Sequence, residues 1–121
     1  MRTRILITTP KGQAIKTEKK LRPFILGITR RVKHETFTNK EDNKIMWIVE
    51  GGIRQIMKIN RNVAMFETTL RMLLTNKMVA GSIKKLKKED QKELMIMLKE
   101  KTTVDVIKAN DEFDMTEFVK Q

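Results

Sequence analysis

Residues 44–50, KIMWIVE, form the most apolar short segment of the chain and decide how the rest of the sequence is interpreted. Five of the seven side chains are hydrophobic, and β-branched and aromatic types predominate among them, which favours a strand. The segment is apolar on both faces, so we expect a central strand with both faces buried. Gly51 and Gly52 follow it and predict a tight turn at its end.

The sequence before this strand predicts a hairpin. Residues 39–43, NKEDN, form a polar turn, and residues 30–38, RRVKHETFT, are rich in β-branched and aromatic types. In a regular strand, where successive side chains point to opposite faces, Val32 and Phe37 would lie on different faces. We therefore expect residues 30–38 to form an irregular or bulged strand.

The amino-terminal region predicts a strand followed by a helix. Residues 2–10, RTRILITTP, are a short apolar run closed by proline, which is typical of a buried strand. From Gly12 the spacing becomes helical, with Pro23 expected to kink or restart the helix and Gly27 to end it. The residues that repeat on one helical face are Ala14, Leu21, Ile25 and Ile28, with Glu18 between them.

The second half of the chain is mainly helical by its pattern. Residues 53–80 predict a short helix and then a second helix for which Asn62 is the expected cap. A further helix is expected over residues 88–100, and residues 102–108, TTVDVIK, predict the last strand.

This order of strand, helix, strand, strand, helices and strand resembles the split βαβ, or ferredoxin-like, plan. We expect an α+β fold with a four-stranded antiparallel sheet, helices on one face and an extra helix before the last strand. The first and third strands are then central, while residues 30–38 and 102–108 lie at the edges. An α+β arrangement with extra helices is the alternative.

The chain is expected to hold one α+β domain, residues 1–109, followed by an acidic segment, residues 110–121. Within that segment Asp114 and Glu117 have the spacing of a capping box, which predicts a short docked helix. Its apolar residues either pack on this protein or bind a partner, and the partner-binding candidates are Phe113, Met115 and Phe118.

Composition narrows the classes of protein. The 121 residues are 40% hydrophobic, as in a globular domain. The chain has no cysteine, which excludes cysteine chemistry, and its single histidine excludes metal sites with two histidine ligands. No apolar run is long enough for a signal peptide or a membrane span. We therefore predict a cytoplasmic protein that does not contact the membrane and has no metal site.

The polar residues do not predict an enzyme. His34 has no partner in the sequence that would orient it as a general base. The loop TTPKGQ, residues 8–13, offers hydroxyls, Lys11 and helix amides to a phosphate, yet it lacks the spacing of a nucleotide-binding glycine loop. We expect no catalytic residues and no cofactor, and an enzyme that uses this loop on a phosphorylated ligand is the minor alternative.

The net charge of +11 is concentrated at the amino-terminal end, where residues 1–40 hold eleven Lys and Arg against two Glu. Such a face favours the backbone of a nucleic acid, DNA or RNA, whose condensed counterions are released on binding. The aromatics that read bases are missing from the expected central strands apart from Trp47, so we expect low sequence selectivity. The expected nucleic-acid-binding residues are Lys11, Lys16, Lys19, Lys20, Arg22, Arg30, Arg31 and Lys33.

Two other interpretations of the charge are open. The lysines and arginines serve only to solvate a small domain, or they bind an acidic protein partner. The second function class is a protein-interaction or inhibitor module, which includes a homodimer. It would use a sheet edge at residues 30–38 or 102–108, or the acidic segment at residues 110–121.

Overall fold

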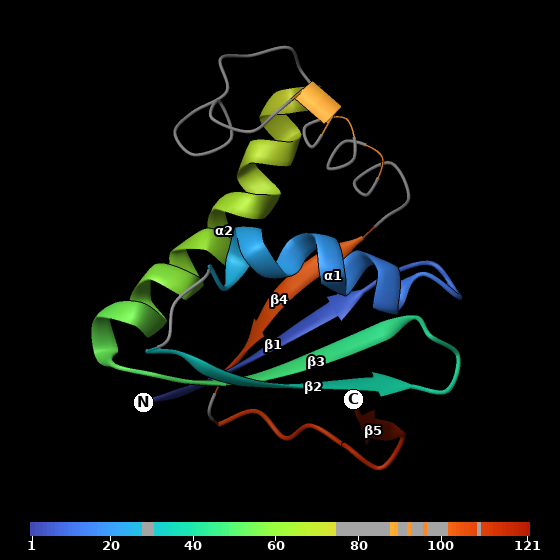
Figure 1. Cartoon of the computed structure of the whole chain (residues 1–121), viewed down its shortest axis with the longest axis vertical. Coiled ribbons are helices and arrows are strands. Elements are labelled where there is room, and N and C mark those ends of the chain that lie inside the picture. The colour runs from blue at the N-terminus through green and yellow to red at the C-terminus, as the bar shows by residue number, and fades with distance from the viewer. Residues whose placement is uncertain (28–30, 75–87, 90–91, 93–95, 97–101, 109) are drawn as a thin grey trace.

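The computed structural model describes residues 1–27, 31–74, 88–89, 92, 96, 102–108 and 110–121. Within these residues the protein is an α+β fold, in which one antiparallel five-stranded sheet packs against two helices (Figure 1). The strands lie in the order β4-β1-β3-β2-β5. In chain order the elements are β1 (Arg2–Thr8), α1 (Ala14–Ile25), β2 (Lys33–Asn39), β3 (Lys44–Glu50), α2 (Ile53–Leu74), β4 (Thr103–Ile107) and β5 (Phe118–Lys120).

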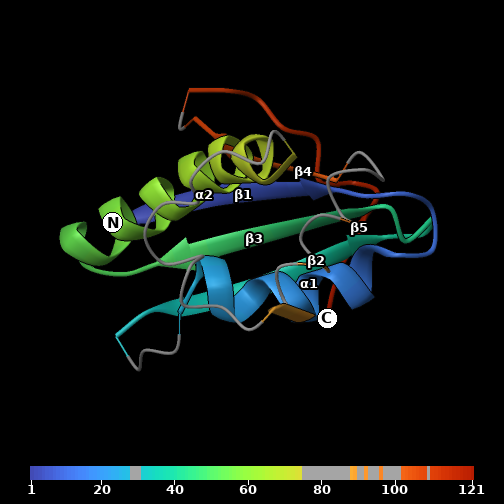
Figure 2. The ribbon, with the colours of Figure 1, turned by 90° about the horizontal axis from the view of Figure 1, so that it is seen from above.

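The strand β3 occupies the centre of the sheet, as its apolar sequence predicts. It pairs with β1 on one side and with β2 on the other, and β2 and β3 form the expected hairpin. Register places Ile5 opposite Trp47 and Ile7 opposite Ile45, so these four side chains share one face. All four are fully buried in the core that the two helices cover (Figure 2).

The sheet differs from the expected one at its edges. Four strands were expected, but β5 pairs with β2, which places β2 inside the sheet and leaves β4 at one edge. β2 is also regular, since its pairing runs without a bulge from Lys33 opposite Glu50 to Thr38 opposite Ile45. The predicted bulge is wrong. Val32 lies before the strand, and Phe37 lies on the face of the sheet away from the helices, so the two residues need not share a face.

Helix α1 follows its predicted pattern closely. Ala14, Leu21 and Ile25 are fully buried against the sheet. The helix continues through Pro23, which is exposed, and Gly27 beyond its end has a φ of 71°, a conformation that favours glycine. The helix ends where the sequence predicts.

A buried carboxylate joins α1 to the central strand. Glu18, only 3% exposed, accepts a hydrogen bond of 3.1 Å from the indole nitrogen of Trp47. It also accepts two bonds of 2.7 Å from Nε and Nη2 of Arg22, one turn later on the helix. The bond to Glu18 raises the pKa of Arg22 above its ordinary value. One carboxylate therefore satisfies a buried donor on β3 and neutralises a cation on α1.

Helix α2 is one continuous helix, where two helices were expected. Its buried side chains recur at helical spacing, with Ile56, Ile59, Val63 and Phe66 facing the core. Asn62 does not cap a second helix. Its amide nitrogen donates a 3.0 Å hydrogen bond to the carbonyl oxygen of Ile25, which ties the middle of α2 to the end of α1. The helix predicted over residues 88–100 falls largely outside the described residues.

The acidic carboxyl-terminal segment docks as a strand, so the predicted helix is wrong. The carboxylate of Asp114 accepts from the amide of Thr116, two residues later, instead of capping a helix at the third residue. This bond holds the pKa of Asp114 below its ordinary value. Glu117, the expected second half of the capping box, lies 3.6 Å from the ammonium group of Lys44. Both carboxylates are thus used in contacts that favour a turn and a strand.

This segment crosses the face of the sheet opposite the helices, from the β4 edge to the β2 edge (Figure 1). Arg4 anchors the crossing, since its Nη2 donates bonds of 2.8 Å to the carbonyl oxygens of Lys108 and Asp111. The crossing accounts for the complete burial of Met46, which register assigns to this face. The segment therefore covers the part of this second face around Met46.

The first prediction concerns the Glu18 carboxylate. Glu18→Ala leaves the buried indole N–H of Trp47 without its acceptor, so it should lower the free energy of unfolding by about 2 kcal/mol. Urea denaturation followed by Trp47 fluorescence measures this. The control is Glu35→Ala, which removes an exposed carboxylate 3.9 Å from Lys120 and should change stability by less than about 0.5 kcal/mol. Equal effects of the two substitutions would contradict the assigned role of Glu18.

The second prediction concerns the docked strand β5. Phe118 is buried and its ring contacts that of Phe113 at 5.7 Å between centroids, whereas the neighbouring Val119 is 67% exposed. Phe118→Ala should therefore destabilise the protein by about 2 kcal/mol, and Val119→Ala by less than about 0.5 kcal/mol. The same denaturation assay compares them. If both substitutions are neutral, the segment does not pack on the sheet in solution.

Candidate anion-binding pocket

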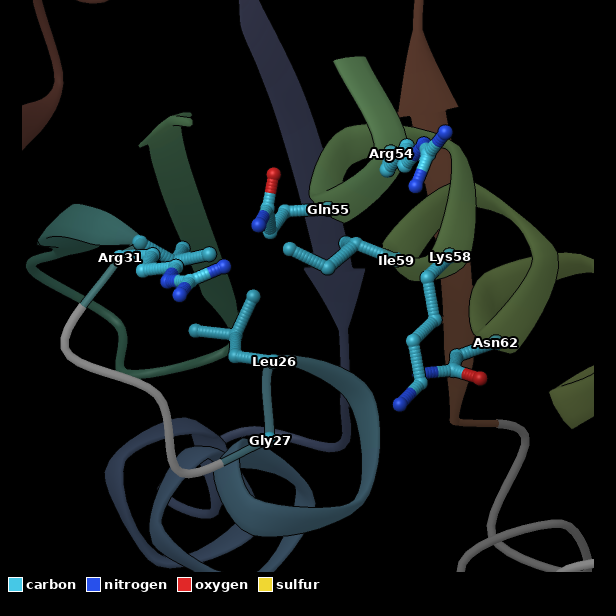
Figure 3. A pocket seen from close by; sticks show the side chains of 9 residues that line it. Leu26, Gly27, Arg31, Arg54, Gln55, Lys58, Ile59 and Asn62 are labelled. Carbon is cyan, nitrogen blue, oxygen red and sulfur yellow. The ribbon is translucent and has the colours of Figure 1, made fainter. Parts of the chain in front are cut away.

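A pocket of about 410 Å³ lies between the end of α1 and the start of α2 (Figure 3). Its wall comes from three parts of the chain: the residues that end α1, the residues that lead into β2, and the first three turns of α2. The lining residues are Leu26, Gly27, Arg31, Val32, Arg54, Gln55, Lys58, Ile59 and Asn62.

Among the residues that the structure describes, three cationic side chains line this pocket and no lining residue is acidic. Arg31 lies on one side of it, and Arg54 and Lys58 come from the other side, one helical turn apart (Figure 3). All three residues are exposed to solvent. Leu26 and Ile59 are buried and lie between the two sides. The pocket therefore combines a positive rim with an apolar floor, an arrangement suited to an anion that carries an organic group.

Local structure explains how the cations meet. Ile56 and Ile59 face the core, which turns Arg54 and Lys58 on the same helix toward solvent. The first turn of α2 has no acidic side chain, so nothing within that turn offsets the positive end of the helix dipole.

The second wall lies against the start of α2. A Cβ atom at Gly51 would lie 3.4 Å from Cγ2 of Val32 and 3.6 Å from the carbonyl oxygen of Arg31. These distances place the backbone before β2 against the backbone before α2. The pairing of β2 with β3 thus brings Arg31 to the same pocket as Arg54, although the two residues are 23 positions apart in the sequence.

The structure brings together only part of the basic face expected from the sequence. Lys11, Lys16, Lys19 and Lys20 are exposed, the last three on the outer side of α1. Arg31 belongs to the pocket. Lys16, Lys19 and Lys20 therefore share one side of α1, Arg31 lines the pocket beside the end of that helix, and Lys11 lies in the loop before it.

Three other expected residues do not join this set. Arg22 is bound to Glu18 through both Nε and Nη2, so its charge is already paired. Lys33 is opposite Glu50 in register and belongs to the sheet face away from the helices. Arg30 lies outside the described residues.

The partner-binding candidates of the acidic segment are used within the protein. Phe118 is buried, and Phe113 and Met115 are half-buried. The ring contact between the two phenylalanines and the pairing of β5 with β2 hold these residues against the sheet. Much of the apolar surface of these residues is therefore buried against the protein's own sheet.

The TTPKGQ loop does not offer its helix amides to a phosphate. The amide of Ala14 donates to the carbonyl oxygen of Asp42, and the amide of Ile15 donates to the Asp42 carboxylate at 3.0 Å. A carboxylate of the hairpin turn therefore already occupies the position of an anion at the start of α1. His34 is exposed on β2, and no group of three or more acidic or histidine side chains in the described residues can hold a metal ion.

Arg54 and Lys58 are the functional candidates that the sequence interpretation missed. Charge summed over residues 41–80 gives only six Lys and Arg against four Asp and Glu, which hides their position. A more sensitive signal is local: two cations four residues apart in the first turns of a helix whose first turn has no acid.

Comparison of the chain with protein-family models, with curated proteins and with solved structures gave no significant match. Of the helices that the structure describes, none has the length and apolar character needed to cross a membrane. The functional argument therefore rests on the geometry of the pocket and on the charge around it.

Proposed function

We propose that this protein acts without catalysis and binds the phosphate backbone of a nucleic acid, DNA or RNA. The observation that carries the proposal is the convergence of Arg31, Arg54 and Lys58 on a pocket in which no lining residue that the structure describes is acidic. The negative charge of a phosphate is attracted to such a group of cations, and its binding releases the counterions condensed on the nucleic acid.

The outer side of α1 extends the positive surface beyond the pocket. Lys16, Lys19 and Lys20 are exposed on the helix whose end forms one wall of the pocket. A strand of nucleic acid with one phosphate in the pocket can place neighbouring phosphates along this helix. Flexible lysines tolerate many backbone paths, which supports binding without a fixed sequence.

The position of Trp47 supports backbone contact over base recognition. Trp47 is fully buried and donates its indole hydrogen to Glu18, so its ring is not available for stacking on a base. Base readers on related sheet architectures use exposed aromatic side chains on the central strands. Low sequence selectivity is therefore part of the proposal.

We also propose that the scaffold is a five-stranded variant of the ferredoxin-like plan. The order of the first four strands, β4-β1-β3-β2, and the position of both described helices on one face support this. In this view β5 is an addition at the edge that β2 would otherwise occupy.

The alternative function is a protein-interaction module or inhibitor, which includes a homodimer. In the sheet as described, β4 is an edge strand with β1 as its neighbour, and such an edge can pair with another chain. The basic surface would then serve an acidic protein. Light scattering that finds a strict monomer, together with failure of the protein to capture any acidic partner, would remove this alternative.

The third prediction tests the backbone contact. Oligonucleotides without terminal phosphates should bind, and log K should fall with log salt concentration. Arg54→Ala/Lys58→Ala should reduce the magnitude of that slope by about 0.7 on a single strand, because the variant loses the one phosphate contact that the pocket makes. Fluorescence anisotropy at several salt concentrations measures both quantities.

The matched control for this experiment is Lys40→Ala/Lys120→Ala. It removes the same charge from two exposed lysines that do not line the pocket, in the β2–β3 turn and in β5. Its slope should stay close to that of the unmodified protein. Absence of binding to single- or double-stranded DNA and RNA at low salt would refute the proposed function.

A further inference from the structure

We infer that the pocket between α1 and α2 takes a nucleoside phosphomonoester, such as the phosphorylated end of a nucleic acid strand or a free mononucleotide. The inference deepens the proposed function, and its strand-end form rests on that function. It assigns the pocket a ligand class that differs from the phosphodiesters along the backbone.

The number of charges favours a monoester. A phosphodiester carries one negative charge, whereas a phosphomonoester carries about 1.5 to 2 at neutral pH and presents three acceptor oxygens. The pocket sets three cationic side chains, Arg31, Arg54 and Lys58, around one space. The guanidinium group of Arg54 can form paired hydrogen bonds with phosphate oxygens, and the ammonium group of Lys58 adds a further point of contact. Arg54 and Lys58 alone supply two positive charges, which match a terminal phosphate better than an internal one.

The remaining lining residues favour an attached nucleoside over phosphate alone. The pocket volume of about 410 Å³ lies within the usual range of small-molecule sites and exceeds what one phosphate needs. Leu26, Val32 and Ile59 provide apolar surface for a base or sugar ring. Gln55 adds an amide group of the kind that pairs with base edges and sugar hydroxyls, whereas the amide nitrogen of Asn62 already donates to Ile25.

The lining residues of the pocket are held in place by contacts with the rest of the protein. The bond from Asn62 to the Ile25 carbonyl oxygen fixes the separation of the two helices. The pairing of Lys33 with Glu50 holds Arg31 and Val32 beside the residues that lead into α2. The buried side chains Leu26 and Ile59 form a floor that belongs to the core. A preformed site loses little conformational entropy when it binds a ligand.

The fourth prediction compares three versions of one single-stranded decamer: 5′-phosphorylated, 3′-phosphorylated and unphosphorylated. At least one phosphorylated end should bind about tenfold more tightly than the unphosphorylated strand, the gain expected from one additional charge-assisted contact. Arg54→Ala/Lys58→Ala should bring that ratio to about one, and Lys40→Ala/Lys120→Ala should preserve it. Circular dichroism checks that each variant is folded.

A second arm uses adenosine 5′-monophosphate, adenosine and inorganic phosphate as ligands in isothermal titration calorimetry. The mononucleotide should bind more tightly than either fragment, and the pocket variant should lose that binding. A gain from phosphorylation in the decamers without mononucleotide binding identifies a strand end as the source. Mononucleotide binding without any decamer binding identifies a free nucleotide, and it refutes the proposed backbone function alone.

Other outcomes overturn the inference. If all three decamers bind equally and the pocket variant weakens them equally, backbone binding stands and the assigned monoester site is wrong. If inorganic phosphate binds as tightly as the mononucleotide, the apolar floor plays no part and the nucleoside assignment is wrong. If neither decamers nor mononucleotide bind, both proposals fail.

Discussion

The arrangement of the helices depends on the carboxylate of Glu18. It is buried, it accepts the indole hydrogen of Trp47 on the central strand, and it holds Arg22 on its own helix. A buried carboxylate is stable only with such partners, so α1 is fixed in rotation as well as in position. That rotation turns Lys16 and Lys19 to solvent and brings the end of α1 beside α2, where Asn62 bonds to Ile25. The pocket is a consequence of this packing.

Much of the fold follows from local patterns that are strong in this sequence. The apolar segment at residues 44–50 forms the central strand β3, the polar turn before it forms the hairpin, and Gly27 ends α1. These elements are predictable because their signals come from neighbouring residues. The carboxyl-terminal segment is not, since Asp114 and Glu117 fit a helix cap equally well in the sequence. The segment forms a strand because it contacts Lys44 and pairs with the edge of β2. These partners are distant in the sequence, so a local residue pattern does not reveal them.

The candidate site shows the same division. Exposed lysines on α1 are predictable, because the apolar face of the helix fixes which side meets solvent. The basic character of Arg22 predicts a phosphate contact. In the structure its charge is instead paired with Glu18, one turn away on the same helix. The pairing register of β2 places Lys33 on the face of the sheet away from the helices, and a shift of one residue would place it on the other face. Arg54 and Lys58 enter the site because β3 pairs with β2, which places the start of α2 beside Arg31 and Val32.

The central claim is that this pocket is where the protein meets a phosphate. The most direct measurement is a titration of the ¹⁵N-labelled protein with a single-stranded oligonucleotide at low salt, followed by amide chemical shifts. The account predicts saturable shifts centred on Arg31, Arg54, Gln55 and Lys58, which added salt reverses. Shifts confined to β5 and the acidic segment, or no shifts at low salt, would contradict it.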